Sequence, residues 1–114
     1  MTLTLATAQP SSTSLGAVIR RARLLKRWSQ RDLMKRSRLD YTYISKLENN
    51  AASYPPSDKV LGQLAEALDL EQADLTILAG RFPRSIQAAV IRLYQQHGDR
   101  LLPMLLELEQ EVRL

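Results

Sequence analysis

Residues 29–49 predict two short helices joined by a tight turn, and this pair constrains how the rest of the chain can fold. Ser29 followed by Asp32 has the spacing of a capping box, in which hydroxyl and carboxylate each accept a bond from a backbone N–H. Asp40 is placed to cap the second helix, which leaves only residues 37–39 for the turn. Helices joined by so short a turn cross steeply instead of lying antiparallel with full overlap.

The second of these helices separates its side chains into two faces. At about 100° per residue, Tyr43, Ile44 and Leu47 fall on one side and predict a buried face. The opposite arc carries hydrogen-bonding side chains: Tyr41, Thr42, Ser45, Lys46 and Asn49. This helix is therefore expected to present a polar face to a partner.

The positive charge is concentrated around the same pair of helices. Residues 20–46 hold ten Lys or Arg and two Asp, a net charge of +8, whereas the rest of the chain carries −4. A basic region beside an acidic remainder predicts attraction of a polyanion to one face of the protein.

The flanking sequence predicts an all-α fold. Apolar residues recur at three- and four-residue spacing in segments 15–26, 57–68 and 72–79, which with the central pair gives a five-helix domain over residues 15–80. Ser14 or Thr13 is expected to cap the first of these helices, and Ser57 the fourth. Residues 1–14, rich in Thr, Ser and Ala, predict a disordered arm.

Residues 81–114 predict a two-helix extension, with the break at Gly98 and Asp99. Pro103 is tolerable in the second of these helices if it lies in the first turn. The extension has more apolar surface than a single short helix can bury, so we expect it to pack on a second copy or on another protein. The candidate interface residues are Ile86, Val90, Leu93, Leu101, Leu105, Leu108 and Val112.

Several classes of protein are not supported by the sequence. The chain has no cysteine, and His97 has no partner at ligand spacing, so we expect neither a metal site nor another cofactor. No nucleophile lies near a histidine and an acid, and no glycine loop could hold a phosphate, so we do not expect an enzyme. No segment is apolar enough for a signal peptide or a membrane span, and we expect a cytoplasmic, nucleoid-associated protein.

Residues 15–80 resemble the Cro and lambda-repressor type (XRE-family) of helix-turn-helix domain. The matching motifs are Leu15-Gly16-x-x-Ile19-Arg20-x-x-Arg23, Ser29-Gln30-x-x-Leu33, Ile44-Ser45-x-Leu47-Glu48-Asn49, Pro56-Ser57 and Leu61-x-x-Leu64-Ala65-x-Ala67-Leu68. Linked motifs that occur in this order and with conventional spacing are far more specific than a basic amphipathic helix alone.

The resemblance implies binding of double-stranded DNA and assigns roles to individual residues. It implies base contacts in the major groove by Tyr41, Thr42, Ser45 and Lys46. It also implies phosphate contacts by Gln30, Arg31 and Asn49, and a structural ion pair between Arg23 and Glu48. A carboxylate at a core edge needs a partner, which agrees with that pair.

Four residues depart from the family pattern, one of which is Tyr41, a bulkier residue than most at that site. Arg38 occupies the turn position that is usually glycine, so either this residue is left-handed or the turn differs. Met34 replaces a usual small residue where the two helices cross, and Asp40 replaces a neutral phosphate contact. We expect Asp40 to act as a helix cap, because an acid near the DNA backbone repels it.

The resulting hypothesis is a dimeric transcriptional regulator that acts through a recognition helix at residues 40–49. One alternative is an antitoxin-like autoregulator whose C-terminal helices bind a protein partner. Another is a binding module that uses its basic face for RNA or protein.

Overall fold

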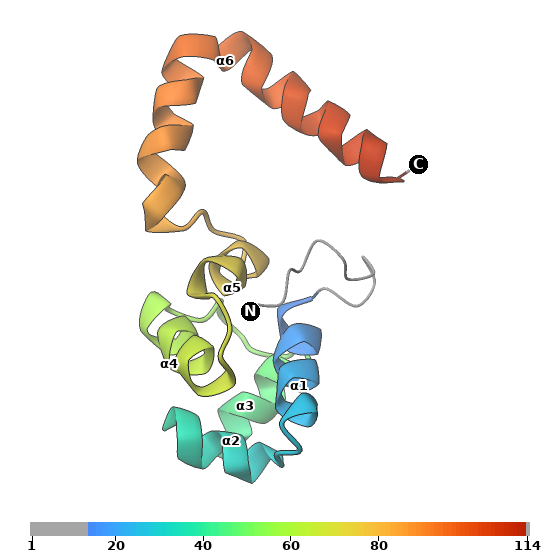
Figure 1. Ribbon diagram of the computed structural model, residues 1–114, viewed down its shortest axis with the longest axis vertical. Coiled ribbons are helices and arrows are strands. Elements are labelled where there is room, and N and C mark those ends of the chain that lie inside the picture. The colour runs from blue at the N-terminus through green and yellow to red at the C-terminus, as the bar shows by residue number, and fades with distance from the viewer. Residues whose placement is uncertain (1–13, 114) are drawn as a thin grey trace. The chain divides into compact units, whose positions relative to one another are not determined.

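The computed structural model describes residues 14–113, with side chains up to residue 111. These residues form helices and no strands, which confirms the all-α prediction (Figure 1). The helices are α1 (Leu15–Leu25), α2 (Gln30–Ser37), α3 (Tyr41–Glu48), α4 (Asp58–Leu68), α5 (Gln72–Leu78) and α6 (Arg84–Arg113). The predicted arm, residues 1–14, lies outside the described residues except for Ser14.

The chain divides into two compact units between Arg81 and Phe82. The first unit contains α1 to α5, and the second contains α6. In the first unit α3 packs on α1 and α2, while α4 packs on α1, α2 and α5. The side chains at the centre are fully buried: Ile19, Leu33, Ile44, Leu61, Leu64 and Leu75.

The helix starts follow the predicted capping residues. Ser14 and Ser57 accept bonds from the backbone N–H groups of Ala17 and Val60. Ser29 and Asp32 form the complete capping box, and the bond from the Ser29 N–H lowers the pKa of the Asp32 carboxyl. Asp40 accepts from Thr42 and Tyr43, so its carboxylate is a cap, as predicted.

The turn between α2 and α3 is made by a left-handed arginine. Arg38 has φ of 62° and ψ of 26°, and its N–H donates to the Met34 carbonyl. Of the two alternatives that the sequence left open, the turn therefore keeps its geometry and Arg38 adopts the strained conformation. This costs about 1 kcal/mol relative to a residue without a side chain.

α1 comes very close to the C-terminal end of α3 at Gly16. A Cβ atom at this position would lie 2.7 Å from both the Glu48 carbonyl oxygen and Asn50 Oδ1, and closer still to the Leu47 carbonyl. The Gly16 N–H also donates to Asn50 Oδ1 at 3.2 Å. α1 can therefore pack against the end of α3 only because residue 16 has no side chain.

The C-terminal unit differs from the prediction in its break. α6 consists of two helical stretches that meet at a kink at His97, where φ is −137° and ψ is 31°, while Gly98 and Asp99 are both helical. Pro103 lies within α6, beyond the first turn after the kink, so it does not meet the condition under which proline is tolerated without loss of a hydrogen bond. At that position proline removes one backbone hydrogen bond from the helix.

Much of the apolar surface of α6 is exposed within its own unit. The exposed large side chains include Ile91, Tyr94, Leu102, Met104 and Leu106.

No helix among the described residues has the length and apolar character needed to cross a membrane.

We predict that Gly16→Ala destabilises the protein by roughly 2 to 3 kcal/mol, because the new methyl group overlaps backbone atoms that cannot move aside. Gly62→Ala is the matched control. The three atoms nearest to the new Cβ there all belong to the side chain of Gln72, and alanine favours the helix interior. Urea denaturation measures both changes. Equal stability of the two variants would contradict the close approach of α1 and α3.

Candidate nucleic-acid interface

The exposed face of α3 carries the side chains predicted to contact bases. Tyr41, Thr42 and Lys46 are exposed and Ser45 is partly buried, whereas Ile44 and Leu47 on the other side are buried. α3 thus presents donors, acceptors and one cation to solvent while its apolar face anchors it to the core. A helix with this exposure can enter a major groove, where base edges offer hydrogen-bonding patterns.

Arg31 and Tyr41 lie together at the edge of this face. The guanidinium carbon of Arg31 is 5.0 Å from the centroid of the Tyr41 ring, which is within cation–π range. A predicted phosphate-contact residue on α2 is therefore held against a predicted base-contact residue on α3. The contact keeps a positive charge beside the start of α3.

The orientation of α3 is fixed by a buried ion pair between Arg23 and Glu48. Arg23 Nε lies 2.7 Å from Glu48 Oε2, and Arg23 Nη2 donates to Oε1 at 2.8 Å. Arg23 Nη1 also donates to the Trp28 carbonyl at 2.8 Å. The hydrogen bond with Glu48 raises the pKa of the Arg23 guanidinium, which keeps it charged. α1 is thereby joined both to α3 and to the loop before α2.

Gln30 joins the start of α2 to the same carboxylate. Its Nε2 donates to Glu48 Oε1 at 3.2 Å. Because an amide nitrogen carries two hydrogens, the second N–H stays available for a phosphate oxygen. Gln30 can therefore brace α3 and contact DNA at the same time.

Asn49 ends α3 with its side chain turned back on the helix. Its Nδ2 donates to the Ser45 carbonyl at 2.9 Å, which leaves one side-chain N–H and the Oδ1 atom for other contacts. A phosphate contact from this residue would use that second N–H.

Asn50 is a structural residue that the sequence analysis did not identify. It has φ of 54° and accepts the Gly16 N–H, and its Nδ2 lies 3.4 Å from Ser14 Oγ. Asparagine is among the residues that adopt positive φ most readily, so the Asn49-Asn50 pair at a helix end was the available signal.

The predicted interface residues of α6 differ in exposure. Ile86, Leu93, Leu105 and Leu108 are exposed, and Val90 and Leu101 are partly buried. The side chain of Val112 lies outside the described residues. The structure places these residues within one element, on both sides of the kink at His97.

We predict that Arg23→Met destabilises the protein by about 3 to 5 kcal/mol, because it leaves the Glu48 carboxylate buried without its cation. The double variant Arg23→Met/Glu48→Met, in which no buried charge remains, should recover most of that loss. Denaturant unfolding of both variants is the measurement. If the double variant is less stable than Arg23→Met, loss of the ion pair does not explain the destabilisation caused by the single substitution.

The geometry can be compared with known proteins. A family model described as helix-turn-helix matches residues 19–75, which include α2, α3, the turn between them and most of α1. No curated protein and no solved structure shows a significant match to the chain. The match spans half of the chain and agrees with the crossed, capped helix pair, so the chain belongs to the XRE type of helix-turn-helix DNA-binding regulators.

Proposed function

We propose that the protein is a sequence-specific transcriptional regulator that binds double-stranded DNA as a dimer. The observation that carries this proposal is the exposed polar face of α3, held in place by the buried Arg23–Glu48 pair. Tyr41, Thr42, Ser45 and Lys46 would meet base edges, and Gln30, Arg31 and Asn49 would contact the phosphates on either side.

The charge distribution supports DNA as the partner. Ten of the sixteen Lys and Arg residues lie between residues 20 and 46, where a duplex would approach α3. Phosphate contacts fix the position of such a protein, and base contacts select the sequence. In a dimer, two copies of α3 would enter successive major grooves about 34 Å apart on a roughly palindromic site. Occupancy of a promoter would then block or recruit the transcription machinery.

We predict different effects from two substitutions at this face. Lys46→Ala should weaken the preferred site by about 1 to 3 kcal/mol and relax the preference for its sequence, because Lys46 is assigned to a base. Gln30→Ala should weaken specific and nonspecific duplexes alike, because Gln30 is assigned to a phosphate. Fluorescence anisotropy with two duplexes at several salt concentrations measures both.

The control for this experiment is the salt dependence of DNA binding by the wild-type protein. Specific binding should weaken steeply as salt rises, since each neutralised phosphate releases counterions. Equal affinity of the wild-type protein for every duplex would exclude sequence-specific regulation. Tighter binding to RNA than to any duplex would favour a module that uses its basic face for RNA.

The dimer proposal rests on α6. Its unit leaves Leu105 about half exposed, together with Leu93, Leu102 and Leu108, which is more apolar surface than one isolated helix usually presents to water. A second copy of α6 would bury this surface in a symmetric interface.

We predict that Leu105→Asp converts the dimer to a monomer, because it places a charge within the apolar surface of α6. Gln110→Asp is the matched control, since it adds the same charge to the same helix at an exposed polar position. Sedimentation velocity at micromolar concentration gives the mass. A wild-type monomer, or a Leu105→Asp variant that remains dimeric, would refute the proposed interface.

The same apolar surface supports a second candidate function. An antitoxin-like autoregulator would use α6 to bind a different protein while the first unit controls its own operon. A small toxin-like reading frame beside the gene, and its co-purification with the wild-type protein but not with Leu105→Asp, would favour this function over the homodimer.

A further inference from the structure

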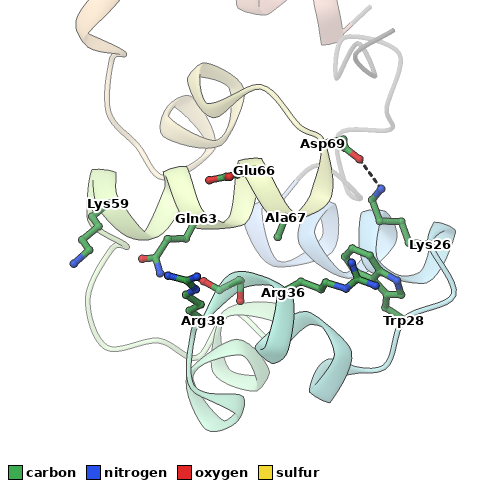
Figure 2. Close-up of a pocket in the computed structure, with 10 residues that line it drawn as sticks. Lys26, Trp28, Arg36, Arg38, Lys59, Gln63, Glu66, Ala67 and Asp69 are labelled. Atoms are coloured by element: carbon green, nitrogen blue, oxygen red, sulfur yellow. Dashed lines mark hydrogen bonds and ion pairs between the residues drawn. The ribbon is translucent and has the colours of Figure 1, made fainter.

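A groove of about 720 Å³ lies between the C-terminal end of α2 and α4, within the first unit. Figure 2 shows Lys26, Trp28 and Arg36 at one end of it and Arg38, Gln63 and Lys59 towards the other. The volume is in the range of small-molecule sites. Tyr41, Thr42, Ser45 and Lys46 do not line it, so the groove is separate from the proposed base-reading face.

The floor of this groove is held by hydrogen bonds. Ser37 is buried, and its hydroxyl donates to the Leu33 carbonyl at 2.7 Å. Gln63 Nε2 on α4 donates to the Ser37 carbonyl at 3.0 Å. These bonds connect the end of α2 to α4, so the groove walls are positioned before any ligand arrives.

The side chains around the groove leave it positively charged. Lys26 Nζ and Asp69 Oδ2 pair at 2.7 Å and offset each other. The remaining charged residues are Arg36, Arg38 and Lys59 against the single carboxylate of Glu66, which gives a net charge of +2. Such a surface favours a ligand that carries two negative charges.

One end of the groove is aromatic. Trp28 is partly buried, and the charged ends of both Lys26 and Arg36 lie 5.2 Å from its ring centroid. The ring restrains the guanidinium of Arg36 while its N–H groups stay able to donate at the edge. With the methyl group of Ala67, Trp28 provides apolar contact for the body of a ligand.

Arg38 contributes to this groove from an unfavourable backbone conformation. Its φ of 62° would suit glycine without strain, yet the position carries an exposed guanidinium that lines the groove. Strained residues are often kept where their side chains have a function. Arg27, at φ of 58°, is the only other left-handed arginine among the described residues, and it does not line the groove.

We propose that the groove between α2 and α4 binds a small organic dianion of the phosphate monoester or dicarboxylate class. Arg36, Arg38 and Lys59 would hold the anionic group, and Trp28 with Ala67 would contact the apolar body. This site would make the protein responsive to a metabolite, and its existence does not depend on the DNA-binding proposal.

The single tryptophan of the chain makes the site measurable. Trp28 gives the only indole N–H signal in a ¹⁵N-resolved NMR spectrum of the full chain. The probes are phenyl phosphate and phthalate, two dianions on a ring, with neutral benzyl alcohol as the control at constant ionic strength. Both dianions should shift the Trp28 signal saturably, and benzyl alcohol should leave it nearly unchanged.

Two arginine variants separate specific binding from general charge. Arg38→Gly and Arg27→Gly each remove one positive charge, and each relieves the backbone strain of one left-handed residue. We expect Arg38→Gly to weaken phenyl phosphate binding about tenfold, the effect of losing a hydrogen bond to a charged group, and Arg27→Gly to leave it unchanged. Lys59→Gln should also weaken binding, with Lys35→Gln, outside the groove, as its control.

Three results would overturn the proposal. A Trp28 signal that shifts with neither dianion would show that the groove does not bind them. Equal weakening by Arg38→Gly and Arg27→Gly would reduce the effect to nonspecific attraction. Displacement of phenyl phosphate by duplex DNA would assign the groove residues to the DNA-binding surface instead.

Discussion

The buried contact between Arg23 and Glu48 is the interaction on which the rest of the first unit depends. A carboxylate removed from water is costly unless charged hydrogen bonds compensate it, and here both oxygens of Glu48 are bonded. Its partners come from α1 and α2, while Glu48 itself ends α3. The Glu48 carboxylate therefore links three helices, through Arg23 of α1 and Gln30 of α2, and these contacts orient the exposed face of α3.

The close approach at Gly16 acts with this ion pair. Gly16 lets α1 reach the carbonyl groups at the end of α3, and Asn50 bonds the Gly16 N–H at the same place. Among the described residues, no buried side-chain nitrogen or oxygen is left without a hydrogen-bond partner. The polar contacts of the core edge are thus complete, which favours one arrangement of the recognition helix over alternatives.

Local sequence signals predicted much of this architecture. Ser29, Asp32, Asp40 and Ser57 identified helix starts because a cap depends on only a few adjacent residues. Apolar spacing predicted the buried side chains of Ile19, Leu33 and Ile44, among others, because one face of each helix must leave water.

Features that depend on contacts between distant parts of the chain were harder to predict from the sequence. The sequence placed Arg38 in the turn, but its left-handed conformation follows from how α2 and α3 pack. The kink at His97, one residue before the predicted break, has no strong local signal, since histidine neither fixes φ nor lacks an N–H. The groove between α2 and α4 is built from residues 26–69, and only the folded chain brings them together.

The central claim is that the face of α3 reads the sequence of duplex DNA. Selection of genomic fragments by the purified full-length protein, followed by sequencing, tests it most directly. The account predicts enrichment of one motif with two related halves whose centres are about 10 base pairs apart, one for each recognition helix. Retention of all fragments in proportion to their length, with no shared motif, would contradict it.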